Sequence, residues 1–386
     1  MSGSGTEVTC AGCGRVVDAA TALPFACPDA TPGDGIDHLL AVPGPVAEDW
    51  SPDPGSENPF VRYRRRTLAY RVARAHGLAD AAYVALVEGL DAAITQVDGG
   101  GFRRTPLSAA PQVLDGVELW WKDETGNVSG SHKARHLMGV MIYLKVLEAL
   151  DLPLARGLSE RPLAIASCGN AALGAAVVAR AARWPLDVFI PPDASPAVVA
   201  RLEALEARVH VCPRTDDTPG DPCVHAFRAA VRAGSLPFGV QGNDNGLAVE
   251  GGKTLGYELV EQLAGQGTRL SSLFVQVGGG ALGSGCIQAL REARAVGTIS
   301  ALPALFTVQT FGAYPLAEAH AAFAATPGTL QARRQHAVTH RGAFMRPWPT
   351  APHSVAHGIL DDETYDWVEL VVAMSETGGQ AVVATE

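Results

Sequence analysis

The stretch that decides the fold is "SLFVQVGGGALGSG", residues 272–285. Its first six residues are mostly apolar, β-branched or aromatic, which is typical of a short buried strand. Glycines at positions 278, 279 and 280 then end the strand, and the residues after them can begin a helix. A strand that passes through a glycine turn into a helix is the repeating unit of a parallel sheet covered by helices.

The same alternation of apolar strands and helices is predicted on both sides of this stretch. Further apolar strands are predicted over 162–167, 186–191 and 304–310. Helices with apolar residues three and four positions apart are predicted over 60–77, 81–97, 170–183 and 250–265. We therefore predict an α/β fold with parallel-type sheets flanked by helices, and ligand sites where strands turn into helices.

The bulk composition limits the classes of function. A chain of 386 residues has room for two domains, or for one large domain with a second lobe. The net charge of −10 argues against a nucleic-acid surface, which needs clustered positive charge. No apolar run is long enough to span a membrane and no secretory leader is visible, so we expect a cytoplasmic protein without a membrane partner.

Residues 1–60 are rich in proline, glycine and aspartate and show little periodicity, which predicts an extended N-terminal arm. The arm carries a partial cysteine knuckle, since Cys10 and Cys13 are followed by one more thiol, Cys27. His38 could be a fourth zinc ligand. The second cysteine pair is incomplete, so the sequence favours a metal-free loop over a zinc site. Seven cysteines spread along the chain do not suggest a disulfide framework.

The glycine turn at 278–280 suggests phosphate binding, because consecutive backbone amides at a helix start can surround an anion. The letters also satisfy the dinucleotide pattern G-x-G-x-x-G, which needs an acidic residue about 20 positions further on. The next strand ends in Gln309 and Thr310 instead. A second glycine-rich stretch, 246–254, is one residue too long for a nucleotide-binding P-loop. Phosphate binding at 278–280 is the favoured interpretation.

A second turn of this kind is "AIASCGNAALGAA", residues 164–176. Amides at the start of the helix near Asn170 would face an anion such as a carboxylate. The Asn170 side chain could contact a ligand or could be an ordinary helix N-cap, and the spacing leaves both open.

The third informative stretch is "ETGNVSGSHKARHL", residues 124–137. Lys133 is one of four lysines in a chain with 26 arginines. Unlike arginine, a buried lysine can lose its proton and attack a carbonyl group, so Lys133 is a candidate nucleophile.

A phosphate cradle, a lysine for a carbonyl and an asparagine for a ring hydroxyl together match pyridoxal phosphate. From about Asn58 to Glu386, the chain resembles the fold-type II pyridoxal-phosphate enzymes, a group that includes threonine synthase, the serine/threonine dehydratases and the tryptophan synthase β subunit. "SGSHKAR" is similar to the family's Schiff-base segment, "SCGNAALG" to its asparagine loop and "GGGAL" to its phosphate loop.

The resemblance implies roles for individual residues. Lys133 would carry the cofactor and act as the catalytic base. The cofactor-binding residues would be Lys133, Asn170, Gly278, Gly279, Gly280, Ala281 and Leu282. The substrate-binding residues would be Ser131, Ser167, Cys168, Gly169 and Arg135. Residues 61–386 would form the catalytic region, with a smaller lobe at approximately 136–240 inserted in the larger one.

The sequence specifies the cofactor more closely than the reaction. "NPFVRYR" and "GFRRTPL" resemble threonine synthase, but Ala134 and Cys168 stand where those enzymes usually carry aspartate and threonine. We therefore expect a lyase that removes the β-substituent of a small hydroxy-amino acid. A synthase acting on O-phosphohomoserine and a non-catalytic cofactor-binding protein are the alternatives.

Two further expectations come from the resemblance. A homodimer is expected. The family's partner for the pyridine nitrogen follows a later strand, and this chain stops at "GGQAVVATE", so a C-terminal part is expected to be missing.

Overall fold

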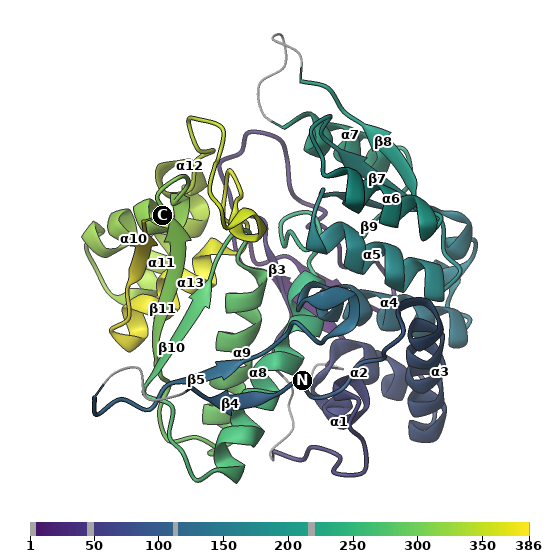
Figure 1. The fold of residues 1–386 in the computed structure, drawn as a ribbon, viewed down its shortest axis with the longest axis horizontal. Helices are drawn as coiled ribbons and strands as arrows, with labels where there is room; N and C mark the ends of the chain where they lie inside the picture. The colour runs from purple at the N-terminus through teal and green to yellow at the C-terminus, as the bar shows by residue number, and fades with distance from the viewer. Residues whose placement is uncertain (1–4, 45–49, 111–114, 215–220, 386) are drawn as a thin grey trace.

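The computed structural model describes residues 5–44, 50–110, 115–214 and 221–385. It has two lobes, each built on its own parallel sheet (Figure 1). In the view of Figure 1 the two sheets lie on opposite sides, with the long helices α8 and α9 and the N-terminal segment between them. The predicted α/β class is confirmed.

The sheet of the smaller lobe has four parallel strands in the order β8-β7-β6-β9. These strands are β6 (Leu163–Ala166), β7 (Leu186–Ile190), β8 (Arg208–Val211) and β9 (Leu236–Pro237). All five residues of β7 are buried. That burial on both faces explains why its sequence is a continuous apolar run rather than an alternating one. All four strands lie inside the 136–240 stretch proposed for this lobe, whose exact limits remain a prediction.

The sheet of the larger lobe has three parallel strands in the order β10-β11-β12. They are β10 (Ser272–Gln276), β11 (Ala304–Thr310) and β12 (Ala381–Ala384). The bounds of β10 and β11 match the strands predicted from sequence to within one residue. A separate hydrophobic cluster surrounds this sheet, with Trp367 and Phe323 among its fully buried side chains.

The helices alternate with these strands as the sequence predicts. The α-helices are α1 (Pro59–Arg62), α2 (Leu68–Ala75), α3 (Asp80–Asp98), α4 (Lys133–Ala149), α5 (Asn170–Ala181), α6 (Pro196–Ala204), α7 (Pro222–Arg232), α8 (Ala248–Gly265), α9 (Ala281–Ala295), α10 (Pro315–Ala325), α11 (Leu330–Thr339), α12 (Arg341–Phe344) and α13 (Trp367–Thr377). The short 3-10 turns are η1 (Arg64–Arg66), η2 (Val128–Gly130), η3 (Pro153–Ala155), η4 (Leu158–Glu160) and η5 (His357–Ile359).

Helices α4, α8 and α9 form the centre of the molecule, and glycines allow them to pack closely. A Cβ atom added to Gly251 would lie 1.9 Å from the carbonyl oxygen of Arg135, and one added to Gly139 would lie 2.7 Å from Gly251. Only glycine fits at such a crossing, because any larger side chain would collide with backbone. The crossing places the first turn of α4, which carries Lys133, against the helices of the larger lobe.

The N-terminal segment differs from the extended arm expected from sequence. It contains a three-stranded antiparallel sheet in the order β2-β1-β3, formed by β1 (Glu7–Cys10), β2 (Val16–Asp18) and β3 (Leu40–Ala41). Val8, Val17 and Leu40 are buried in the main hydrophobic cluster. Strands of two to four residues are too short to show periodicity, which is why the sequence did not reveal them. A second small hairpin pairs β4 (Leu107–Ala109) with β5 (Trp120–Lys122).

None of the helices in the described ranges combines the length and the apolar character needed to cross a membrane.

Candidate active site

Lys133 is the first residue of α4, directly after a strained loop. Ser129 has a φ of 57° and Gly130 a φ of 73°, both in the left-handed region. A non-glycine residue held there costs free energy and is frequent at functional sites. The hydroxyl of Ser131, a buried side chain, accepts a hydrogen bond from the Lys133 amide at 3.4 Å. The loop therefore fixes the position from which the Lys133 side chain starts.

The other three lysines are all paired. Lys122 donates to Glu258 at 2.6 Å, Lys145 to Glu148 at 2.8 Å, and Lys253 forms an ion pair with Glu250. By contrast, the Lys133 amino group makes no hydrogen bond or ion pair with any residue in the described ranges. Burial lowers the pKa of Lys133, against the opposing influence of two carboxyl groups, Asp361 and Asp366. An unpaired amine with a lowered pKa is suited to nucleophilic and base chemistry.

The turn between β6 and α5 lies next to Lys133. A Cβ atom added to Gly174, on the second turn of α5, would lie 3.1 Å from the backbone nitrogen of Ala134. The starts of α4 and α5 are therefore in close contact. Asn170 is the first residue of α5 and is exposed, whereas Gly169 occupies the N-cap position. No side chain caps this helix, so the Asn170 side chain is not an N-cap.

The groups of this turn that were predicted to bind a substrate carboxylate are not all free to do so. The Ser167 amide donates to the Phe189 carbonyl at 3.2 Å within the sheet, and the Ser167 hydroxyl accepts from the Gly169 amide at 3.4 Å. The first N–H groups of α5 have no partner within the helix, as at any helix start. Cys168 is an exposed residue, and partial desolvation of its thiol raises the thiol pKa. Backbone amides rather than a thiolate are thus the anion-binding groups that this turn presents.

The glycine turn lies between β10 and α9, as the sequence predicts. Gly280 is the N-cap of α9 with a φ of 98°, which favours glycine. Ala281 and Leu282 are the first two residues of the helix.

A segment near the end of the chain covers this turn. The Thr364 hydroxyl donates to the Gly278 carbonyl at 3.0 Å, and the Asp366 amide donates to the Gly279 carbonyl at 2.9 Å. A Cβ atom added to Gly279 would lie 3.0 Å from the Tyr365 ring. The sequence analysis did not identify this segment, because "DDETYDW" matches no motif and approaches the turn only in the folded chain.

Two carboxyl groups on this segment, Asp361 and Asp366, interact electrostatically with Lys133. Burial raises the pKa of Asp361 to about 7, while Lys133 and the Gly279 amide act in the opposite direction. Burial likewise raises the pKa of Asp366 to about 8. A Cβ atom added to Gly278 would lie 2.7 Å from a carboxyl oxygen of Asp361. The Asp361 carboxyl group therefore lies against the glycine turn, where the Gly279 amide favours its ionised form.

Arg135 requires a correction, because the structure contradicts a substrate-binding role. Its side chain is completely buried, and all five of its N–H groups donate to protein atoms. The acceptors are Glu124, Glu258, Thr105 and Thr254. No donor remains for a substrate carboxylate. Arg135 instead belongs to a buried ion-pair network that joins α4 to α8. Its position two residues after Lys133 in the sequence did not indicate this role.

The residues present fit pyridoxal phosphate. An unpaired lysine amine has the chemistry to condense with an aldehyde, the exposed asparagine at the adjoining turn has the donor and acceptor groups that suit a ring hydroxyl, and the glycine turn has backbone amides that suit a phosphate. Two lobes with parallel sheets around such a lysine define the class of fold-type II pyridoxal-phosphate enzymes.

The particular family follows from comparison with known proteins. A family profile described as "Pyridoxal-phosphate dependent enzyme" matches residues 99–384. The chain belongs to this family, whose cofactor is pyridoxal 5′-phosphate.

Individual relatives agree with this assignment. The chain is 32% identical over 195 residues to a serine dehydratase-like protein of Mus musculus, across 49% of this chain and 53% of that protein. It is 30% identical over 195 residues to L-serine dehydratase of Saccharomyces cerevisiae, across 49% of this chain and 56% of that enzyme. The match thus spans about half the length of these relatives. The processed form of threonine deaminase isoform 2 from Solanum lycopersicum shares the fold, with a TM-score of 0.53 and 17% identity over 80% of this chain and 75% of that one.

Proposed function

We propose that this chain forms the site of a pyridoxal-phosphate-dependent ammonia-lyase that acts on a small hydroxy-amino acid such as serine or threonine. The observation that carries the proposal is the amine of Lys133, which has no partner among the described residues and belongs to a helix whose start packs against the start of α5. The serine dehydratase names of two relatives support the choice of substrate class.

The cofactor would be held at three points. The amides of Gly278, Gly279 and Gly280, with those of Ala281 and Leu282 at the start of α9, would bind the phosphate. Asn170 would contact the ring hydroxyl, and Lys133 would be the point of covalent attachment. When bound, pyridoxal phosphate supplies an electron sink that stabilises negative charge on the α-carbon of an amino acid.

Lys133 would also move the α-proton. Burial lowers the pKa of its amine, so a larger fraction is unprotonated at neutral pH than for an exposed lysine. With cofactor and substrate bound, the free Lys133 amine would accept the α-proton as a general base. The overall reaction would release the β-hydroxyl with a proton as one water and consume one water in hydrolysis, giving one 2-oxo acid and one ammonia for each amino acid.

The turn between β6 and α5 would hold the substrate carboxylate. The amides of Cys168 and of the first turn of α5, with the hydroxyl of Ser167, are the groups available there. Ser131, buried beneath Lys133, would position the lysine and the substrate rather than react itself. Helix N-termini stabilise anions through these amides without a basic side chain.

The ion pairs of the N-terminal arginines favour a lyase over a synthase acting on O-phosphohomoserine. A phosphorylated substrate needs a second anion site, and unpaired burial of its charge would be costly. Arginines of the two stretches that resemble threonine synthase are already paired with carboxylates, as Arg62 with Glu261, Arg64 with Asp80, Arg103 with Asp91 and Arg104 with Glu57. Arg135 is fully used as well.

The test is a side-by-side assay of the full chain, loaded with pyridoxal phosphate, on L-serine, L-threonine and O-phospho-L-homoserine. The lyase proposal expects 2-oxo acid and ammonia in equal amounts from serine or threonine. Threonine formed only from the phosphorylated substrate would instead establish the synthase. A bound cofactor without turnover of any of the three would establish the non-catalytic alternative.

The homodimer and the cytoplasmic location stay predictions, the first from the family resemblance and the second from composition. Light scattering of the purified chain and fractionation of expressing cells would check them.

A further inference from the structure

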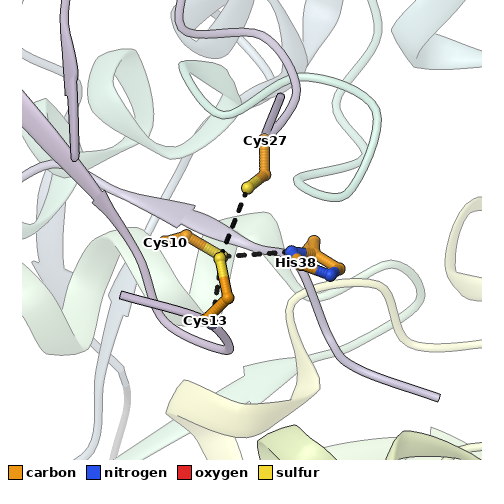
Figure 2. A group of neighbouring side chains, drawn as sticks. All are labelled: Cys10, Cys13, Cys27 and His38. Carbon is orange, nitrogen blue, oxygen red and sulfur yellow. Dashed lines mark hydrogen bonds between the residues drawn. The ribbon is translucent and has the colours of Figure 1, made fainter. Parts of the chain in front are cut away.

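Four potential metal ligands from the N-terminal segment converge on one point (Figure 2). Cys10 ends β1, Cys13 follows in the knuckle, Cys27 lies on the next loop and His38 precedes β3. Their sulfur and nitrogen atoms all lie within 4.8 Å of one another. The cluster is separate from the candidate active site and plays no part in the proposed reaction.

The distances match a tetrahedral zinc site. Bonds of about 2.3 Å to sulfur and about 2.0–2.1 Å to nitrogen place neighbouring ligands of a tetrahedral ion roughly 3.6–3.8 Å apart. The sulfurs of Cys13 and Cys27 are 3.6 Å apart, and the Cys10 sulfur is 3.5 Å from Nδ1 of His38. A disulfide would bring two sulfurs to about 2.05 Å, so the thiols are not oxidised to each other.

The surroundings orient the histidine as in known metal sites. Nε2 of His38 lies 3.0 Å from a carboxylate oxygen of Asp34, which leaves Nδ1 directed at the sulfurs. A carboxylate that accepts the second ring N–H fixes the tautomer and the orientation of a metal-bound imidazole. The Asp34 carboxylate is in turn held by the backbone amides of Thr31 and Ile36.

The backbone conformation brings the segments that carry these ligands close together. A Cβ atom added to Gly12, between the two knuckle cysteines, would lie 2.5 Å from the Asp37 carbonyl oxygen. Only glycine allows the loop that carries His38 to come so close. The amide of Ala11 donates to the Leu39 carbonyl at 2.8 Å, and the amide of Cys13 donates to the Cys10 sulfur at 3.5 Å. Such amide–sulfur bonds stabilise a thiolate.

We propose that Cys10, Cys13, Cys27 and His38 bind one structural zinc ion. Three thiolates and one imidazole form a soft, four-coordinate set that suits zinc. Because the protein supplies all four ligands, no position is left for a substrate, which is the pattern of a structural rather than a catalytic site. The convergence reverses the preference for a metal-free loop that the incomplete cysteine pattern suggested.

The zinc would secure a loop that hydrogen-bonds to two distant parts of the chain. The Phe25 carbonyl accepts from the Gly246 amide at 2.7 Å, on the segment that follows β9 of the smaller lobe. On the other side, the Asp37 amide donates to the Val338 carbonyl at 2.7 Å, and the Arg341 amide donates to the Gly35 carbonyl at 2.9 Å. The loop from 25 to 38 is thus bonded both to the turn that leads into α8 and to α11–α12.

The same loop forms one wall of a cleft of about 1030 Å³, whose other walls include α7 and Tyr365. Tyr365 also lies against the glycine turn at Gly279. Loss of the metal would therefore loosen a wall of the inter-lobe cleft without removing any group proposed to bind the cofactor.

The experiment uses the full chain expressed with added zinc. It measures the zinc content and the resistance of residues 25–38 to proteolytic cleavage. We expect about one zinc per chain, lowered at least about fivefold in Cys13→Ser and in Cys27→Ser. Cys212→Ser is the matched control, since Cys212 is a free cysteine outside the cluster, and it should keep its zinc. Cobalt exchanged into the wild-type protein should show the thiolate charge-transfer and tetrahedral visible bands.

The cobalt spectrum keeps the test decisive even if the cysteine variants fail to fold, because it uses the wild-type chain. Chelation should also raise the rate of proteolytic cleavage within residues 25–38 while bound pyridoxal phosphate stays. Wild-type protein without zinc and without the cobalt bands would overturn the proposal, as would a Cys13→Ser variant with undiminished zinc. A failed lyase assay would leave these results unchanged, so the two proposals fail independently.

Discussion

The two strand-to-helix turns of the candidate site have similar sequences but different surroundings. The turn at Ser167–Asn170 is open, since Cys168 and Asn170 are exposed and, among the described residues, no other segment comes within 4 Å of a Cβ added to Gly169. The turn at 278–280 is covered by the 361–366 segment, whose Thr364 and Asp366 bond to its carbonyls. Under the proposed function, the open turn would hold a substrate carboxylate that enters and leaves, and the covered turn a cofactor phosphate that stays.

The largest effect should come from substitution of Lys133, the residue proposed to attach the cofactor and to accept the substrate proton. Lys133→Ala should lower the rate of 2-oxo acid formation at least about 10³-fold, because it removes the attachment point and the base together. Borohydride reduction of the holoenzyme should trap the cofactor on wild-type protein and not on this variant.

Lys145→Ala is the matched control for Lys133, since Lys145 is a paired lysine on the same helix. It should retain the trapped adduct and most of the activity. Recovery of the adduct on Lys122, Lys145 or Lys253 in the Lys133 variant would show that the assignment is wrong.

A smaller effect should separate the covered turn from the open one. In Gly279→Val the new side chain would meet the Tyr365 ring, 3.0 Å from the Cβ position, and so compete with the close approach of a phosphate. The Kd for pyridoxal phosphate should rise at least about tenfold. Gly169→Ala, in the open turn, should leave this Kd within about twofold and change the KM for substrate instead. Equal cofactor affinity in both variants would contradict the placement of the phosphate at 278–280.

The covered turn should also make stability depend on pH. The folded-state pKa of Asp366 is about 8, above the value near 4 of an aspartate in the unfolded chain, so the folded chain holds the proton between these values. The free energy of unfolding of the cofactor-free protein should therefore fall as pH rises from 5 to 8, by up to about 1.4 kcal/mol per pH unit from this group.

Asp366→Asn should make this dependence shallower in urea titrations, because asparagine does not ionise. The exposed Asp115→Asn is the control and should follow the wild-type curve. A wild-type slope that survives in the Asp366 variant would mean that another group controls the pH dependence.

Local patterns in the sequence were enough to predict the frame of the site. The apolar run before Gly278 forms β10, and α5 begins at Asn170, because burial and helix initiation depend on residues close in the chain. The motif around Lys133 was also recognised from residues that are close together in the chain. Their roles remain predictions, but their positions relative to the two turns follow directly from the α/β fold.

The sequence analysis failed where distant segments meet. The fate of Arg135 depends on Glu258, 123 positions away, and the cover of the glycine turn comes from residues 86 positions further along the chain. The sequence named His38 as a possible fourth ligand of the cysteine knuckle, but only the folded chain shows its ring within 4.8 Å of the three sulfurs. No local period or motif encodes such contacts, since they depend on tertiary packing.

The smallest effect is expected at Cys168, and it bears on how the open turn holds an anion. Cys168 is an exposed residue, but partial desolvation of its thiol and the nearby carboxyl groups raise the thiol pKa, so at neutral pH it is a neutral group rather than a thiolate. If the backbone amides bind the carboxylate, Cys168→Ser keeps every donor and should change kcat/KM for serine by no more than about threefold, roughly 0.6 kcal/mol. If a thiol-alkylating reagent inactivates the wild-type enzyme by modifying Cys168 and blocking the turn, the Cys168→Ser variant should keep its activity after the same treatment. A loss of more than about 100-fold in Cys168→Ser, beyond what loss of a neutral contact explains, would mean that the sulfur itself takes part in the reaction. The open turn would then differ from the covered one in its chemistry, and not only in its exposure.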